Sequence, residues 1–537
     1  MTRTTANTLF PHRLLALSVS AVLLAGCGGG GGDVNLDASS STNITDNSVT
    51  NSGGGGSTNP CANYLDPDTN TRIQGTFDGT NCVYGPEFVG EDNPLLVSLT
   101  IPFITGVHVF EDTLQVGKFV DGTNPAETVP QDGAGPTLTI RAGNKLAWTN
   151  PDDYLLINRG SRIIAEGTSV APITLTGFND AILRNAGKED TQLWGGVVIN
   201  GNGITNKCSD AQRTGNTCHV KSEGKDSFYG GNNNTESSGS LKYVVIKHPG
   251  FEVAPGDELN GLTLNAVGSG TTIENIQVYS TYDDGVEFFG GAAKVKNLVA
   301  LYVQDDSIDW ADGWVGSVEN ALVIQSTTDG DRCIEADNQE LNFDALPRSM
   351  PTIRNLTCIP SGAKVPVATH GDSMGAEFRR GTQFKLEDSI FYTGYAQALS
   401  PAQNPGRCLR ITDAPTATFA KAGDSYVKST VLACNTPTSN GTAWPAGDSV
   451  ADVLNNKNGA YPAYTNNRLI TLTAGQPVDT DLVLLNRFYT ATTLKDLDGV
   501  TYTVTPATAG NFIGAVRAND DWTAGWTVGL AQDDLWF

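Results

Sequence analysis

The sequence predicts an all-β chain folded as a right-handed parallel β-helix, a solenoid in which successive coils add similar strands. The first indication is an acidic phrase that recurs: residues 283–288 read Asp-Asp-Gly-Val-Glu-Phe, residues 305–310 read Asp-Asp-Ser-Ile-Asp-Trp, and weaker copies follow at 331–336 and 373–378. Glu287, Asp309 and Glu335 are 22 and then 26 residues apart, which is the length of one solenoid coil. The second indication is a series of short β-rich runs, from about residue 97, with little helical periodicity. Such strands can also form a sandwich, but the repeat favours the solenoid.

The N-terminus has the layout of a bacterial export signal. Arg3 and Arg13 form a positively charged region before a short apolar stretch at 14–25, and that stretch is too short to span a bilayer. The stretch ends in Leu-Ala-Gly-Cys at 24–27, which resembles the lipoprotein processing box and implies cleavage before Cys27 and a diacylglycerol on its sulfur. Gly28 stands where lipoproteins of the inner membrane usually carry Asp, so we expect an outer-membrane protein displayed at the cell surface. A plain signal peptide with an incidental cysteine is the alternative.

The rest of the chain divides by composition. After the signal peptide (1–26), residues 27–60 hold the lipidated cysteine and a Gly-, Ser- and Thr-rich tether that cannot bury a core and should be disordered. We expect an entry or cap region at 61–130 and the β-helix at 131–394. Residues 395–537 should contain late coils with long loops and a C-terminal cap that covers the open end. Within them, residues 448–456 suit a short helix with Asp448 or Ser449 as its N-cap.

Cysteine usage supports an exported protein. Nine cysteines less Cys27 leave an even number that falls into local couples, which suggests disulfides formed in an oxidising compartment. Neighbours in sequence are neighbours in space in a solenoid, although spacing alone does not prove the connectivity. The expected bonds are Cys61–Cys82, Cys208–Cys218, Cys333–Cys358 and Cys408–Cys434.

The charge balance excludes one class of partner. The chain has 34 Lys and Arg against 58 Asp and Glu, a formal net charge of −24. Such a surface repels phosphate backbones, so we expect no nucleic-acid binding. After the signal, no stretch is long and apolar enough to cross a membrane, so the expected membrane contact is the N-terminal lipid anchor.

Alternation within each acidic copy predicts where its side chains point. An apolar residue stands on either side of the acid, and successive side chains of a strand face opposite sides. We therefore expect the acids to form a surface column and their apolar neighbours to lie in the core, with coils about 4.8 Å apart. The acids are Glu287, Asp309, Glu335 and Glu377, and the neighbours are Val286, Ile308, Ile334 and Ala376.

A column of like charges requires protons, cationic partners or a bound cation. Ca²⁺ is the candidate cofactor, because it takes roughly six to eight oxygen ligands and because Asp337 and Asn338 follow a dense group of acids. That group is Asp305, Asp306, Asp309 and Asp312. The alternative is that Arg332, Arg379, Arg380 and solvent neutralise the column.

Several motifs resemble those of a known family. They are Ile-Ile-Ala-Glu-Gly-Thr at 163–168, Trp-Gly-Gly-Val-Val-Ile-Asn-Gly at 194–201, Gly-Val-Glu-Phe-Phe-Gly-Gly at 285–291, Asp-Ser-Ile-Asp-Trp at 306–310 and Asp-Trp-Thr-Ala-Gly-Trp-Thr at 521–527. They are similar to signatures of exported bacterial right-handed β-helix proteins of the pectate-lyase-like superfamily, many of which are lipoproteins. The likeness covers about residues 130–394 and the C-terminal motif. It implies the fold and export, and no particular reaction.

The sequence alone does not decide whether the protein is an enzyme. Parallel β-helices often host polysaccharide lyases and glycoside hydrolases, and in either case Glu287, Asp309 and Arg379 would be the candidate catalytic residues. Adjacent coils place Glu287 and Asp309 near the roughly 5 Å separation of a retaining hydrolase, but any stacked acidic ladder meets that criterion. We expect instead a binding or presentation protein of the envelope, with glycan as its ligand. A carbohydrate-active lyase or hydrolase is the first alternative, and an accessory of an outer-membrane transporter is the second.

Overall fold

The computed structural model describes residues 59–131, 133–326, 328–361, 370–371, 373–393, 406–472, 493–495, 501–508, 511–517 and 519–531. The predicted signal peptide, Cys27 and nearly all of the predicted tether lie outside the described residues. No helix among the described residues has the length and apolar character needed to cross a membrane.

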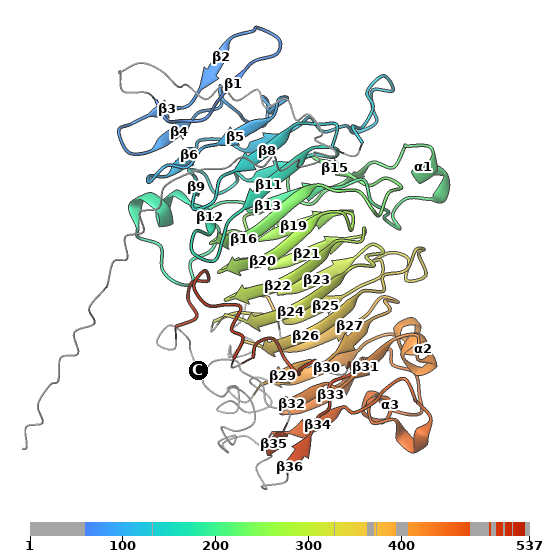
Figure 1. Cartoon of the computed structure of the whole chain (residues 1–537). Coiled ribbons are helices and arrows are strands. Elements are labelled where there is room, and N and C mark those ends of the chain that lie inside the picture. Colours follow the sequence, from blue (N-terminus) through green and yellow to red (C-terminus); the bar gives the residue numbers. More distant parts are fainter. Residues whose placement is uncertain are drawn as a thin grey trace, which may run out of the picture. The chain divides into compact units, whose positions relative to one another are not determined.

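Two parallel sheets run the length of the described coils and enclose one apolar core (Figure 1). The ten-stranded sheet contains β7 (Leu114–Val116), β10 (Leu155–Ile157), β13 (Val197–Asn200), β19 (Leu262–Asn265), β21 (Val286–Phe289), β23 (Ile308–Ala311), β25 (Arg332–Ala336), β27 (Met374–Phe378), β30 (Arg407–Ile411) and β33 (Thr436–Asn440). Neighbouring strands of this sheet come from successive coils, and all of their pairings are parallel. The predicted parallel β-helix is confirmed.

The eighteen-stranded sheet forms the opposite and lateral walls. It contains β3 (Thr76–Phe77), β4 (Cys82–Tyr84), β5 (Leu99–Ile101), β6 (His108–Phe110), β8 (Thr137–Ile140), β9 (Lys145–Trp148), β11 (Arg162–Glu166), β12 (Ile173–Gly177), β16 (Gly239–Lys247), β20 (Thr272–Tyr279), β22 (Lys294–Leu301), β24 (Ser317–Ile324), β26 (Thr352–Ile359), β28 (Lys385–Glu387), β29 (Ile390–Tyr392), β31 (Tyr426–Lys428), β32 (Val431–Cys434) and β34 (Arg468–Thr471). Parallel pairing between coils begins at β4 with β6, before the predicted limit 131, and continues to β32 with β34, in the region where late coils were expected.

Smaller elements project from the coils. Two-stranded antiparallel sheets are formed by β1 (Asn63–Leu65) with β2 (Arg72–Gln74), β14 (Val220–Lys221) with β15 (Phe228–Tyr229), β17 (Glu252–Ala254) with β18 (Asp257–Glu258), and β35 (Thr493–Lys495) with β36 (Thr501–Thr503). The helices are α1 (Asp210–Thr214), α2 (Ala414–Ala422) and α3 (Val450–Leu454), with a π-helix at Asn179–Leu183 and a 3-10 turn at Lys457–Gly459. The predicted helix near 448–456 is α3, and the Ser449 side chain caps it by accepting from the Asp452 amide.

An asparagine ladder bends the long strands into two walls. Asn275, Asn297, Asn320 and Asn355 have φ between +56° and +59° and interrupt β20, β22, β24 and β26. Asparagine tolerates this left-handed conformation better than most residues. The Asn297 side chain donates to Asn275 Oδ1 at 3.0 Å, and Asn320 donates to Asn297 Oδ1 at 2.9 Å. The repeated bend therefore keeps successive coils in register.

All four predicted disulfides are present. Cys333 on β25 bonds to Cys358 on β26, and Cys408 on β30 bonds to Cys434 on β32. Each of these two bonds joins the ten-stranded to the eighteen-stranded sheet across the core, where its cysteines are fully buried.

The described part of the C-terminal segment is placed differently from the prediction. We expected it to cap the open end, but residues 511–517 and 519–531 run back along the outer face of β26, β24, β22 and β20 (Figure 1). The Ala515 amide donates to Thr357 Oγ1 at 2.9 Å, and the Val528 amide donates to Gln277 Oε1 at 2.8 Å. Trp522 packs there on a buried apolar cluster that includes Val299 and Leu322. These strands carry apolar residues on their outer face, and the segment covers that face instead of the solenoid end.

Candidate functional site

The predicted acids form one column on the ten-stranded sheet. Glu287 on β21 is the register partner of Asp309 on β23, Asp309 pairs with Glu335 on β25, and Glu335 pairs with Glu377 on β27. Their apolar neighbours Val286, Ile308, Ile334 and Ala376 are fully buried in the core. The register prediction is therefore confirmed, and the interval of 42 residues before Glu377 holds loops instead of an extra coil, because β25 pairs directly with β27.

The column is not the exposed surface that we expected. Glu287 and Glu335 are each 7 % exposed and Glu377 is 2 % exposed, so the acids face outward but are covered. Part of the cover comes from the excursion between β13 and β16, whose Glu223 lies close enough to Glu287 to raise its pKa. Asn260 closes the other side by donating to Glu287 Oε2 at 2.6 Å. The alternation of the repeat predicted the outward direction, whereas the cover comes from segments without a repeat.

Arginines neutralise the half of the column toward the C-terminal coils. Arg332 contacts Glu335 at 2.9 Å and Glu377 at 2.7 Å, and Arg379 contacts Glu335. Arg410 Nε and Nη2 donate to the two oxygens of Glu377, each at 2.7 Å. Although burial opposes ionisation, these contacts and the Thr412 hydroxyl bring the pKa of Glu377 down to about 2. For Glu335 and Glu377 the predicted neutralisation by arginine is confirmed.

Asp337 has arginine partners too. Arg379 Nε contacts Asp337 Oδ1 at 2.8 Å, and Arg380 Nη1 contacts Asp337 Oδ2 at 2.6 Å. Burial and the nearby Asp309 nevertheless raise the pKa of Asp337 to about 8. Asp337 therefore belongs to the ion-paired part of the column, and its oxygens are already engaged.

The other half of the column is a cluster of carboxylates, which we call the acid cluster. It consists of Asp283, Asp284, Glu287, Asp305, Asp306 and Asp309. Carboxylate oxygens of Asp284, Glu287 and Asp309 lie within 4.8 Å of one another, as do those of Asp283, Asp284 and Asp305. Arg332 Nη1 lies 3.7 Å from Asp306 Oδ2 at the edge of the cluster. Within the described part of the chain, no Lys or Arg forms an ion pair with Asp284, Glu287 or Asp309, so these three like charges meet without a direct cationic partner.

Burial and mutual repulsion shift the acid cluster toward protonation. Burial, Glu223 and Asp309 raise the pKa of Glu287 well above its usual value, and burial with Asp283 and Glu287 does the same for Asp284. Burial raises the pKa of Asp305 to about 6 against the opposing charges of His370 and Arg332. Glu223 keeps exposed surface, yet desolvation by the surrounding protein raises its pKa to about 7. These acids therefore favour either shared protons or a bound cation.

Two buried oxygens point to a cation. Asp306 Oδ1 and Asp309 Oδ1 are inaccessible to solvent and have no hydrogen-bond partner among the described residues. Asp306 is 5 % exposed as a whole, and an unsatisfied buried acceptor is costly. A hard divalent cation such as Ca²⁺ would satisfy oxygens of this kind. Asp283 and Asp305 are only half-buried, so the cluster is open to solution at the coil corner.

Asp312 does not belong to the acid cluster, contrary to the prediction. Its carboxylate contacts Lys207 Nζ at 2.8 Å and accepts from the Tyr229 hydroxyl at 3.3 Å. Asn338 is also engaged elsewhere, since its side chain donates to the Phe343 and Ala345 carbonyls. Asp312 follows the end of β23 whereas Asp305 and Asp306 precede its start, so the length of the strand separates them.

An open pocket continues the column at its C-terminal end. Arg410 is the register partner of Glu377 and of Ser439 on β33. With Arg407, Thr412 and Asn440 these residues line a cavity of about 350 Å³. Ser439 Oγ is buried without a hydrogen-bond partner in the described structure. Arg407 and the Ser439 hydroxyl, beside the Glu377–Arg410 ion pair, make this pocket suited to an anionic group.

The comparisons place this architecture in a family. The model of the pectate-lyase-like β-helix domain matches residues 126–444, which is more than half of the chain and includes the whole acid column. The chain belongs to this family. No curated protein and no solved structure matches the chain. Membership of the pectate-lyase-like β-helix family fits a carbohydrate-related role.

The three residues predicted as catalytic candidates, Glu287, Asp309 and Arg379, lie in or directly after strands of the ten-stranded sheet. Glu287 and Asp309 are register partners, and Arg379, which follows β27 two coils beyond Asp309, contacts Glu335 and Asp337. Burial, with Arg380 and Arg332, lowers the pKa of Arg379 to about 10. Sequence reasoning missed Glu223, Asn260 and Lys207, which lie in or beside loops outside the repeat. It also gave no role to Arg410, although the repeat places it one coil beyond Glu377.

Proposed function

We propose that the protein is an outer-membrane lipoprotein, anchored through Cys27, whose acid cluster holds Ca²⁺ and through it binds an acidic glycan. The observation that carries the proposal is the juxtaposition of Asp284, Glu287 and Asp309, with carboxylate oxygens within 4.8 Å and no ion-paired Lys or Arg in the described structure. Ca²⁺ takes roughly six to eight oxygen ligands, so the protein would supply some and leave others to the glycan and water.

The charge of the chain supports a bridging cation. A net charge of −24 repels a polymer of uronic acids, and that repulsion must be overcome locally for binding. A cation held by the acid cluster would attract a glycan carboxylate. The pocket lined by Arg407 and Arg410 would hold a second carboxylate further along the column. From Asp309 to Arg410 the column advances three strands, or roughly 14 Å, a length that spans several sugar units.

Calorimetric titration with oligogalacturonate, with and without Ca²⁺, tests this proposal. We expect binding that requires Ca²⁺ and that Asp309→Asn weakens at least about tenfold, because the variant removes one negative ligand. Glu319→Gln, on β24 of the other sheet, is the matched control and should bind as the native protein does. Equal binding in the presence of chelator would contradict the role of the cation, and the absence of any binding would contradict the ligand class.

A second candidate function is a polysaccharide lyase that acts at the same site. The specific observation in its favour is the lowered pKa of Arg379, two coils beyond the acid cluster, because a lyase needs a basic group beside the sugar. The ultraviolet absorbance of the unsaturated product separates the two functions. A Ca²⁺-dependent rise that Arg379→Lys abolishes would favour the lyase, whereas binding without product favours the binding protein.

A further inference from the structure

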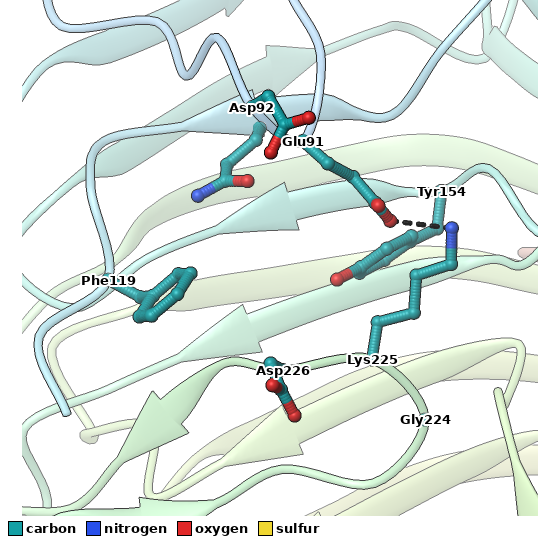
Figure 2. A pocket seen from close by; sticks show the side chains of 8 residues that line it. Glu91, Asp92, Phe119, Tyr154, Gly224, Lys225 and Asp226 are labelled. Atoms are coloured by element: carbon teal, nitrogen blue, oxygen red, sulfur yellow. Dashed lines mark ion pairs between the residues drawn. The ribbon is translucent and has the colours of Figure 1, made fainter.

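A second cavity lies on the ten-stranded sheet, near the N-terminal coils and apart from the acid cluster. It has a volume of about 340 Å³ and lies between three segments: the loop after β4, the strands β7 and β10 with the residues beside them, and the turn between β14 and β15. The lining residues are Glu91, Asp92, Gln115, Phe119, Tyr154, Gly224, Lys225 and Asp226 (Figure 2). Its size is within the range of small-molecule sites.

Two largely buried residues, Gln115 and Tyr154, turn polar groups toward this cavity, and these groups make no hydrogen bond among the described residues. Gln115 is 3 % exposed, and its side-chain amide makes no hydrogen bond to any residue that the structure describes. Tyr154 is likewise 3 % exposed, and its hydroxyl has no partner in the described ranges. Figure 2 shows this hydroxyl directed away from the Glu91–Lys225 ion pair, toward the space between Phe119 and Asp226. Neither group belongs to the solvent-inaccessible unsatisfied atoms, so the Gln115 amide and the Tyr154 hydroxyl are open to the cavity and can hydrogen-bond a ligand there.

An ion-pair network holds the walls of the cavity in place. Lys225 Nζ contacts Glu91 at 2.5 Å and Asp152 at 3.3 Å, which ties the β14–β15 turn to the N-terminal loop. The Tyr154 ring packs beside Leu156, Val198 and Leu259 in a buried apolar cluster. The packing of its ring therefore holds Tyr154 in position before a ligand arrives.

We propose that this cavity binds a neutral sugar unit. A pyranose offers hydroxyls that both donate and accept, which matches an amide, a phenol and carboxylates, and it offers C–H faces that pack on aromatic rings such as Phe119. The three lining acids outnumber Lys225, so a uronate or phosphate is disfavoured here. The proposal does not rest on cation binding, because none of the acid cluster lines this cavity.

Saturation-transfer NMR of the full mature chain with a panel of methyl glycosides and N-acetylglucosamine, in chelator, tests the proposal. We expect transfer to at least one neutral sugar, and an affinity that Tyr154→Phe or Gln115→Leu lowers about tenfold, because each removes one buried hydrogen-bonding group. Tyr426→Phe and Gln131→Leu are matched controls outside the cavity and should leave the affinity unchanged.

Phe119→Ala provides a second route, because this half-buried ring can be removed without opening the core. It should weaken sugar binding while the melting temperature stays close to that of the native protein. Absence of transfer to every sugar in the panel would overturn the proposal. Binding that is unchanged in Tyr154→Phe, Gln115→Leu and Phe119→Ala alike would overturn it as well. Neither result bears on Ca²⁺-dependent binding of oligogalacturonate, so the two sites are tested separately.

Discussion

Glu287 and Asp309 are register partners on the adjacent parallel strands β21 and β23, and both carboxylates face away from the core. Asp284 adds a third carboxylate within 4.8 Å. The next pair along the same column, Glu335 and Glu377, is surrounded by arginines. The column thus changes from uncompensated acids to ion pairs within one coil, and this difference determines how each half should respond to pH and to cations.

The first prediction concerns the acid cluster in chelator. Its folded-state pKa values are raised, to about 6 for Asp305 and well above the usual value for Glu287, over unfolded values of about 4. Between these limits the native state holds more protons than the unfolded state, so the free energy of unfolding falls as pH rises. We expect the melting temperature, followed by circular dichroism, to decrease between about pH 4.5 and pH 7.

Ca²⁺ should reverse that decrease, and most strongly at the upper end of the range, because protons and Ca²⁺ compete for the same oxygens. Glu287→Gln should flatten the pH dependence in chelator, since it removes one acid whose pKa is raised. The exposed Glu127→Gln serves as control and should leave the slope unchanged. A melting temperature that rises across this range, or that does not change on addition of Ca²⁺ at pH 7, would contradict the cation site.

The second prediction concerns Glu377, for which the sign is opposite. Its folded-state pKa of about 2 lies below the unfolded value of about 4.3. The ion pairs therefore stabilise the fold above about pH 4.3, and this stabilisation is lost as pH falls toward 2. Glu377→Gln should lower the free energy of unfolding at pH 7 by about 3–5 kcal/mol, because it breaks the buried ion pairs of Glu377 with Arg332 and Arg410.

Urea denaturation at pH 7 and at about pH 3 measures this effect. The difference between Glu377→Gln and the native protein should shrink at the lower pH. Glu127→Gln breaks the exposed pair with Lys118 and should cost less than about 1 kcal/mol at either pH. Similar losses for the two variants at pH 7 would show that the arginine contacts of Glu377 contribute little.

Much of the architecture could be predicted because it repeats. The two-residue alternation around Glu287 and Asp309 defines the strand register, and a slip by one residue would bury the acids in the core at a large cost. The local cysteine couples are correct for a related reason, since successive coils place nearby residues side by side.

The burial of the acid column could not be predicted, because the segments that cover it do not belong to the repeating coils. Glu223 reaches Glu287 from an excursion whose path depends on tertiary packing and on the Cys208–Cys218 bond. Lys207 lies in the same excursion and binds Asp312, which removes that acid from the cluster. The prediction for the C-terminal segment was wrong for a similar reason. Its Trp-containing motif is visible in the sequence, but the face that it covers forms only when β20, β22, β24 and β26 stack.

The third prediction concerns the membrane anchor. Cys27→Ser should abolish labelling by radioactive fatty acid and release the protein from the detergent phase, because one diacylglycerol-modified cysteine is the expected attachment. A control with Cys208→Ser and Cys218→Ser, which removes a disulfide and leaves the N-terminus intact, should still be labelled. Fatty-acid labelling that persists in Cys27→Ser would contradict the anchor.

The fourth prediction compares two disulfides. Cys333–Cys358 closes 25 residues and joins the two sheets across the core, whereas Cys208–Cys218 closes 10 residues in an excursion outside the core. Removing the first bond by Cys333→Ala and Cys358→Ala should lower the free energy of unfolding by about 3 kcal/mol, because the unfolded chain gains conformational entropy. The cavity left in the core should lower it further.

Removing the second bond should change global stability less and instead expose the acid column, because the excursion that carries Glu223 is the part it constrains. Urea denaturation measures the first effect, and hydrogen exchange of the amides around Glu287 measures the second. The expected pattern is a lower urea midpoint for the Cys333–Cys358 variant and faster exchange near Glu287 for the Cys208–Cys218 variant. If both variants lost the same stability with no local change in exchange, the excursion would be an integral part of the folding unit, and the column would be covered by the coils themselves.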